Sequence, residues 1–305
     1  MMASSCRICG STRHQTVLSN YQAMGRSWDL IQCLSCGLVS TEPIPDDDIL
    51  EGRYSQDYWA ASDDRTTGAV YNIRMRGFAR RLRKMVRSGD KALDVGAGNG
   101  AWVGLLNACG FEAVGIDPYA AGSAAGPVLK YALEDAPFEK TSFDLISFMH
   151  VLEHTRDPAV TLKTAHQLLK PGGLLVIEVP NIGSLGFTVF NKRWFPLDDI
   201  PSHINHFNRQ SLIHSVRNCG TYTLILDGGF SLKDSPSILV NSLFPGLSPR
   251  RVRRRNDGRH PLYLKVIYLM AQATLLPAAM ILARAGRGEI IRLVFKKYEN
   301  GTKSP

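Results

Sequence analysis

Four of the six cysteines lie in two short pairs near the start of the 305-residue chain. Each pair has the spacing C-x-x-C followed by glycine, and the candidate metal ligands are Cys6, Cys9, Cys33 and Cys36. A C-x-x-C turn directs two sulfurs at one point, so two such turns can complete the tetrahedral thiolate cage that zinc prefers. Four protein ligands leave no open position for chemistry, so the spacing predicts a structural zinc ion. A redox role is the alternative.

A glycine-rich segment forms the second site with recognisable chemistry. The sequence DVGAGNG at 94–100 stands between an apolar run and a stretch that can begin a helix. Glycines let the backbone turn sharply and approach a ligand, and the N–H groups of a helix start face that ligand. Asp117 ends the next apolar run, where a carboxylate suits a ribose diol. The loop alone leaves the cofactor open, because Gly96, Gly98 and Ala101 also fit a nicotinamide-dinucleotide pattern.

The elements that must position these residues follow from the apolar pattern. From residue 91 onward, short apolar runs alternate with helical stretches, which predicts βαβ units and a mainly parallel sheet. A basic amphipathic helix is expected over 72–87, and a further helix begins after the glycine loop. Seven strands are expected, at 92–95, 113–116, 128–131, 144–148, 174–179, 222–226 and 289–295. The predicted fold class is therefore α/β, with one doubly wound sheet.

Composition and charge limit the remaining choices. With 44% apolar and 21% charged residues, the chain can bury a substantial core. The net charge of +9 favours anionic partners, and the first residues lack the apolar run of a signal peptide, so we expect a cytoplasmic protein. We expect a cysteine module at 1–42, a connector with the basic helix at 43–90, and the main domain at 91–305, which carries an insert at 228–288.

The order of the motifs identifies a family resemblance. The segments in question are DVGAGNG at 94–100, GID at 115–117, FDLI at 143–146, VLEH at 151–154, LKPGG at 169–173 and VPN at 179–181. Their order and spacing resemble those of class I S-adenosylmethionine (SAM)-dependent methyltransferases, over about 90–230. With the cysteine pairs, the chain resembles bacterial methyltransferases that have a leading zinc ribbon and are often associated with surface-polysaccharide or natural-product pathways. The core is similar to that of ubiquinone-pathway O-methyltransferases.

This resemblance implies a Rossmann-like seven-stranded methyltransferase sheet, a small N-terminal zinc-ribbon module, and SAM as cofactor. It places Gly96 and Gly98 behind the amino-acid part of the cofactor and gives the ribose hydroxyls to Asp117. The aspartate often found near the adenine amino group would fall at Ala132, so that contact is expected from the backbone. The full set of expected cofactor contacts is Asp94, Gly96, Gly98, Gly100, Asp117, Leu133, Glu134 and His150.

Methyl transfer from a sulfonium requires alignment of the acceptor and, for a hydroxyl or an acidic carbon, removal of a proton. A histidine suits that task near neutral pH. By resemblance, the segment H-I-N-H-F at 203–207 lies beside the acceptor, so His206 or His203 is the first choice for the base. His150 is the third choice, and structural hydrogen bonding is the alternative for each.

Two further features are suggested by resemblance. Tyr54, Tyr58 and Trp59 repeat an aromatic pattern that serves as a lid in sugar methyltransferases with a zinc ribbon, although connector packing explains them equally well. The segment 150–154 aligns with a divalent-metal cluster of the ubiquinone-type enzymes. His150 stands where that cluster has a carboxylate, and magnesium prefers oxygen ligands, so the substitution counts against a metal there.

The insert combines an arginine run with an apolar stretch. Six arginines lie between 250 and 259, and the following segment 266–283 carries no charge. Such a pair can hold a protein peripherally at the inner face of an anionic membrane, which would suit a lipid-linked glycan acceptor. The alternative is a solvated loop followed by a helix packed on the sheet.

The leading functional prediction is a SAM-dependent methyltransferase that acts on a small-molecule or glycan-type acceptor. A nucleic-acid methyltransferase is the second possibility, but the chain has no N-P-P-aromatic motif, since Asn181 follows the proline, and no RNA-binding signature. A scaffold protein that has lost catalysis is the third, and the intact glycine loop argues against it.

Overall fold

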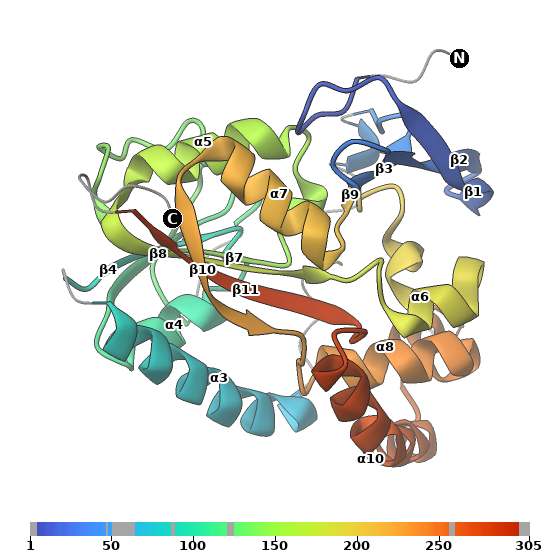
Figure 1. Ribbon diagram of the computed structural model, residues 1–305. Helices are drawn as coiled ribbons and strands as arrows, with labels where there is room; N and C mark the ends of the chain where they lie inside the picture. The colour runs from blue at the N-terminus through green and yellow to red at the C-terminus, as the bar shows by residue number, and fades with distance from the viewer. Residues whose placement is uncertain are drawn as a thin grey trace.

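The computed structural model describes residues 5–46, 48–50, 65–86, 89–120, 125–255 and 260–298, with the backbone alone at 65–72, 254 and 255. A central sheet lies between two layers of helices, and a small antiparallel module sits at one corner (Figure 1). The aromatic residues Tyr54, Tyr58 and Trp59 lie outside the described residues.

The central sheet has seven strands in the order β10-β11-β8-β7-β4-β5-β6. The five strands from β8 to β6 run parallel, whereas β11 is antiparallel to both of its neighbours. Each of the seven predicted strands overlaps one of these, so the predicted sheet is confirmed. The strands are β4 (Lys91–Val95), β5 (Glu112–Ile116), β6 (Val128–Leu129), β7 (Phe143–Met149), β8 (Leu169–Pro180), β10 (Tyr222–Gly228) and β11 (Ile290–Lys297).

The middle strands are buried on both faces, as their continuous apolar sequences require. Helices α3 (Arg65–Met85) and α4 (Ala101–Asn107) cover one face, and α5 (Pro158–Leu168) and α7 (Arg209–Cys219) cover the other (Figure 1). The predicted basic amphipathic helix forms most of α3. Met75, Ala79 and Leu82 recur at helical spacing and are buried, whereas Ile73 is exposed.

The corner module consists of β1 (His14–Ala23), β2 (Arg26–Cys33) and β3 (Val39–Glu42). A fourth strand, β9 (Asn205–His206), comes from the main domain and pairs with β3, with Val39 opposite His206. Ile8 and Leu38 of the module also pack in one buried cluster with Phe207 and Leu212. The module and the main domain therefore share both a sheet and a core.

The segment between β8 and β9 and the insert between β10 and β11 pack against each other. The first contains α6 (Leu185–Phe190), η2 (Asn191–Arg193) and η3 (Phe195–Asp199). The second contains α8 (Asp234–Leu243), η4 (Pro245–Leu247), α9 (Pro249–Arg255) and α10 (Leu262–Arg284). Two ion pairs join them, from Arg250 to Asp199 at 2.6 Å and from Arg251 to Asp198 at 2.8 Å.

The structure corrects one expectation about the insert. The arginine run is partly helical and ion-paired, and the apolar stretch is not packed on the sheet. Helix α10 lies against α8, and only Tyr268 and Ala279 are buried among its residues. Within the described part of the chain, α10 is also the one helix that has the length and composition of a membrane span.

Candidate active site

The glycine loop occupies the carboxyl end of β4. Gly96, Gly98 and Gly100 all have positive φ angles, of 68°, 52° and 74°, which side chains rarely adopt. Gly96 also has no room for a side chain, since a Cβ there would lie 2.4 Å from a methyl carbon of Val151. The loop therefore needs glycine both for its turn and for the close approach of the segment that follows β7.

Two aspartates hold the loop. Asp117, at the end of β5, accepts hydrogen bonds from the backbone N–H groups of Gly98 at 3.0 Å and Tyr119 at 2.8 Å. Asp94 is buried beneath the loop and accepts a hydrogen bond from the Ser147 hydroxyl at 2.7 Å. Burial raises the pKa of Asp94 to about 7. This position suits support of the loop more than direct contact with a ligand, whereas Asp117 lies at the strand end where a ribose was expected.

The two residues expected near the adenine differ in their surroundings. Leu133 is buried in the same cluster as Val95 and Ile116, which end the first two strands. Glu134 is exposed and accepts a hydrogen bond from the Thr161 hydroxyl of α5 at 2.7 Å. Leu133 therefore provides an apolar surface beside the carboxyl ends of β4 and β5, and Glu134 is held by its hydrogen bond to α5.

His150 directly follows β7 and is the centre of a charged cluster, which we call the His150 cluster. Its Nδ1 lies 3.3 Å from Oε1 of Glu153, in the short helix η1 (Leu152–His154). Its Nε2 lies 3.2 Å from Oε1 of Glu178 on β8 and 3.8 Å from Oδ2 of Asp234 on α8. Arg292 of β11 completes the cluster by donating to the other oxygen of Glu178. His150 has a positive φ of 58°, and its side chain is 34% exposed, so the imidazole reaches the surface of the site.

The carboxylates set the charge of this imidazole. Burial alone would lower the pKa of His150, but hydrogen bonds to Asp234, Glu153 and Glu178 raise it well above its usual 6.5. Burial opposes ionisation of Glu178, and the charges of Arg292 and His150 overcome this effect and lower the Glu178 pKa. The surrounding carboxylates therefore favour the protonated form of His150.

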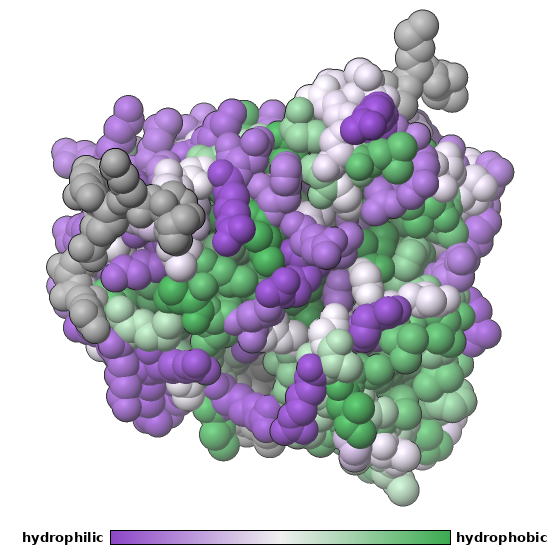
Figure 2. Space-filling model, in the orientation of Figure 1, coloured by the Kyte–Doolittle hydropathy of each residue, from purple (hydrophilic) through white to green (hydrophobic). Residues whose placement is uncertain are grey.

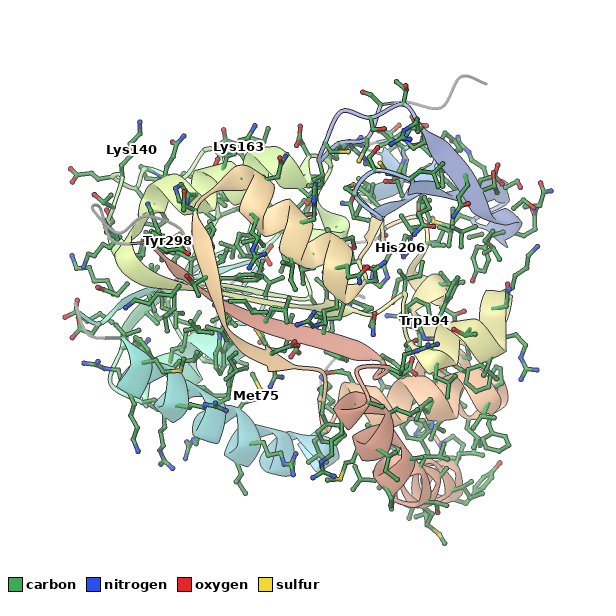
Figure 3. All side chains as sticks on the ribbon, viewed as in Figure 1. Met75, Lys140, Lys163, Trp194, His206 and Tyr298 are labelled. Atoms are coloured by element: carbon green, nitrogen blue, oxygen red, sulfur yellow. The ribbon has the colours of Figure 1, made fainter. Side chains whose placement is uncertain are left out.

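His203 and His206 lie elsewhere, at the junction of the corner module and the main domain, where Figure 3 shows His206. Both are buried. The Thr41 hydroxyl donates to the His203 carbonyl at 2.8 Å, so Nε2 of His206, 2.9 Å away, must donate to Thr41. Burial and nearby positive charge lower the pKa of His206 to about 3. Neither ring contacts His150.

The aligned metal segment is divided in two by the fold. Glu153 and His154 group with His203, whereas His150 groups with Glu178 and Asp234, the ligand atoms of each group lying within 4.8 Å of one another. His154 Nδ1 is already engaged by the Ser202 carbonyl at 2.9 Å. The Arg292 guanidinium donates to the other oxygen of Glu178, so the group of His150, Glu178 and Asp234 already has a positive charge beside it.

Two neighbouring cavities lie near this edge of the sheet, and the smaller one adjoins the His150 cluster through Arg292. The smaller, of about 270 Å³, includes Arg292 and Ser231 in its wall, and the Ser231 hydroxyl donates to Asp234 at 2.5 Å. The larger, of about 570 Å³, lies between the start of α3, the end of β10 and the end of α10. Arg74 and Phe230 line both cavities, with the guanidinium 5.5 Å from the ring centroid. This pair therefore stands between the two cavities.

The four predicted metal-ligand cysteines come together in the corner module. The sulfurs of Cys6 and Cys36 are 3.5 Å apart, those of Cys9 and Cys33 are 3.6 Å apart, and all four lie within 4.8 Å of one another. Tetrahedral zinc with bonds of about 2.3 Å would separate its sulfurs by roughly 3.8 Å. The neighbouring Cys36 sulfur lowers the pKa of the Cys6 thiol to about 4. The donor set and the spacing thus fit a tetrathiolate zinc site.

Comparison with known proteins identifies the reaction class. A family model described as a methyltransferase domain matches residues 71–223, half of the chain. The chain belongs to this methyltransferase family. Together with the glycine loop and the strand order, the match makes it a class I SAM-dependent methyltransferase and confirms the predicted fold and enzyme class.

The individual relatives vary in how much they share. A ubiquinone biosynthesis O-methyltransferase of Ruegeria pomeroyi is 31% identical over 53% of this chain and 75% of that protein. A tRNA U34 carboxymethyltransferase of Methylococcus capsulatus is 38% identical, but over 30% of this chain and 32% of that protein. The chain spans less than two thirds of the length of several such relatives, for example 58% of the ubiquinone enzyme of Bradyrhizobium diazoefficiens.

Among solved structures, the 1,6-didemethyltoxoflavin-N1-methyltransferase of Burkholderia thailandensis has a similar fold. It aligns over 93% of this chain and 100% of its own, with a TM-score of 0.50 and 11% identity. That structure contains bound S-adenosylhomocysteine and 1,6-didemethyltoxoflavin. At this identity the likeness concerns the fold.

The loop geometry predicts that Gly96→Ala removes SAM binding. The substitution combines an unfavourable positive φ with overlap of the new methyl group and Val151. We expect the dissociation constant, measured by isothermal titration calorimetry, to rise by about tenfold or more, since each tenfold corresponds to about 1.4 kcal/mol. Gly77→Ala is the control, because this glycine of α3 has open space around its Cβ position. Unchanged affinity in Gly96→Ala would show that the loop does not contact the cofactor.

Proposed function

We propose that the chain transfers the methyl group of SAM to a nucleophilic group of an anionic small molecule, with a sugar-type acceptor as the leading case. The observation that carries this proposal is the His150 cluster, which stands at the carboxyl edge of the sheet and contributes Arg292 to the wall of the smaller cavity. The glycine loop and Asp117 occupy the same edge, one and two strands along from β7. SAM, when bound, supplies an electrophilic methyl group, and the chain itself has to align the acceptor and manage its proton.

Arginines favour an anionic acceptor. Arg74, Arg209 and Arg284 line the larger cavity, and Asp227, paired with Arg209 at 2.5 Å, is the one acidic side chain among the described residues of its wall. Arginine recognises phosphate and carboxylate groups through paired N–H donors. An acceptor with a phosphate among these arginines would direct its other end along the smaller cavity, toward Asp234 and His150.

His150 is our choice for the proton acceptor, in preference to His206. A base has to reach the acceptor, and the side chain of His150 is 34% exposed whereas His206 is buried and engaged by Thr41. Once neutral, His150 can take the acceptor proton, and Glu153, Glu178 and Asp234 then stabilise the imidazolium that results. In this proposal His203 and His206 are positioning residues.

We further propose that Cys6, Cys9, Cys33 and Cys36 bind one structural zinc ion. The metal would stabilise a module too small to build a large core of its own. It lies away from the cavities, so its role would be to hold β1, β2 and β3 in place against β9. The four ligands fill a tetrahedral shell, which leaves the ion no site for a substrate.

The role of His150 as the base can be tested through the pH at which its imidazole titrates. We expect His150, followed by nuclear magnetic resonance of the imidazole, to titrate above 6.5. Asp234→Asn removes a carboxylate that raises this pKa, so the titration should move to lower pH by about one unit, which corresponds to 1.36 kcal/mol. The rising limb of turnover with pH should move in the same direction, because the neutral base then forms earlier. If the His150 titration shifts in Asp234→Asn while the rising limb of turnover stays at the same pH, His150 is excluded as the base.

The zinc proposal predicts one zinc ion per purified chain by elemental mass spectrometry. Cys33→Ser should lose most of the metal and unfold at lower denaturant concentration, since a structural zinc ion contributes directly to folding. Cys109→Ser is the matched control, because this cysteine lies on the main domain away from the cluster. Full zinc content in Cys33→Ser, or no zinc in the unaltered chain with four reactive thiols, would contradict the assignment.

The acceptor class can be tested with labelled SAM and three sets of probes. Uridine diphosphate sugars represent the anionic sugar class, the corresponding free sugars lack the phosphates, and unmodified tRNA represents the nucleic-acid alternative. We expect methyl incorporation into the nucleotide sugars, weakened through KM by Arg284→Ala. If free sugars are labelled as well as the nucleotide sugars, the arginines do not select the acceptor by its phosphates. If tRNA alone is labelled, the chain is a nucleic-acid methyltransferase.

A further inference from the structure

The outer surface of α10 is unusually apolar for a helix in contact with water. Leu262, Met270 and Ile281 expose 76%, 66% and 64% of their surface. In the most apolar stretch of 18 residues within the helix, 11% is buried. In Figure 2 the hydrophobic surface gathers at the lower right, over α6, α8 and α10. Val189 of α6 and Phe244 at the end of α8 are also exposed. Patches of this kind usually mark a binding surface.

The apolar residues share one face of the helix. At 100° per residue they occupy an arc of roughly 160°. The buried Tyr268 and Ala279 lie on the opposite side, and the exposed Lys265 stands on the flank. The face consists of Leu262, Tyr263, Val266, Ile267, Met270, Ala273, Thr274, Pro277, Ala278 and Ile281, and contains no charge.

The helix is held along the body of the protein. Tyr268 and Ala279 are buried on its inner side, and it packs along α8. Its last turn leads through Gly286 directly into β11 of the central sheet. At about 1.5 Å per residue a helix of this length extends roughly 35 Å. A helix attached along this length can lie in the plane of a surface but cannot cross a bilayer without leaving its partner α8.

Charge indicates the kind of surface. Residues 249–288 contain nine lysines and arginines against one aspartate, while the whole chain has a net charge of +9. Arg250 and Arg251 are neutralised by Asp199 and Asp198, and the surrounding segment is still strongly basic. A second copy of this chain would bring like charges together across the patch, which opposes association. Anionic lipid headgroups complement the charge, and acyl chains complement the apolar face.

We propose that α10 is an in-plane docking helix that binds the chain to an anionic membrane surface. Its apolar face enters the boundary between headgroups and acyl chains, and the exposed Lys265 on its flank contacts the headgroups. Met280, Ala283 and Arg284 of the same helix line the larger cavity. Docking therefore places that cavity next to the headgroup layer.

Flotation with lipid vesicles tests this proposal on the full, zinc-loaded chain. Vesicles of equal parts phosphatidylglycerol and phosphatidylcholine should carry the protein upward at low ionic strength, and high salt should weaken binding. Vesicles of phosphatidylcholine alone should bind at least about tenfold less, because each basic residue near an anionic surface contributes about 1 kcal/mol. The double variant Ile267→Glu and Met270→Glu, which places two charges on the apolar face, should lower partitioning by a similar factor.

Met24→Glu with Val160→Glu is the matched control, since both residues are exposed apolar side chains away from α10. Circular dichroism and SAM binding should be the same in both double variants. Any of three outcomes would overturn the proposal. In the first, the unaltered chain fails to float with anionic vesicles. In the second, the α10 double variant binds vesicles as well as the unaltered chain, and in the third, the control double variant loses as much vesicle binding as the α10 variant. Self-association that the α10 variant abolishes, seen by sedimentation without vesicle binding, would assign the face to a second copy instead.

Discussion

A buried carboxylate fixes the geometry of this enzyme. Glu178 lies at 1% exposure near the end of β8, in the middle of the sheet, where an unpaired charge would cost several kcal/mol. Arg292 stands directly opposite on β11 and supplies the compensating charge, and His150 supplies a second from the end of β7. Because both partners come from adjacent strands, the pairing of these groups and the register of β7, β8 and β11 depend on each other. The imidazole is therefore held by the sheet itself.

The same arrangement explains why the site is charged and still ordered. Glu178 is neutralised by Arg292, which also lies over the ring of Phe78 at 4.7 Å, so this carboxylate serves as a fixed support. Asp234 is different, since it comes from the insert, is 26% exposed, and accepts a hydrogen bond from Ser231, which lines the smaller cavity. The insert thus contributes to the charge of a group that the sheet positions. Through Ser231 and Asp234, the smaller cavity is linked to the surroundings of His150.

Much of this was predictable because it depends on local sequence. Apolar runs located the seven strands, glycine spacing located the loop with its positive φ angles, and C-x-x-C spacing located the sulfur cluster. The partners of His150 were not predictable, because Arg292 is 114 positions from Glu178 and only the fold brings them together. The H-I-N-H-F segment gave no sign of its burial, and the two-residue β9 is too short to leave a pattern. An apolar run likewise does not distinguish a buried helix from an exposed one, as α10 shows.

The corner module, although it carries no reacting group, is connected to the active site through backbone hydrogen bonds. The Thr41 N–H of β3 donates to the Ile204 carbonyl at 2.9 Å, and the Ile204 N–H donates to the Glu153 carbonyl at 2.9 Å. Glu153 is the residue that faces Nδ1 of His150. The module, the 203–206 segment and η1 therefore form one continuous support behind the imidazole. Loosening of the sulfur cluster would reach the active site through the position of Glu153, since the cofactor loop has a separate anchor to Asp117.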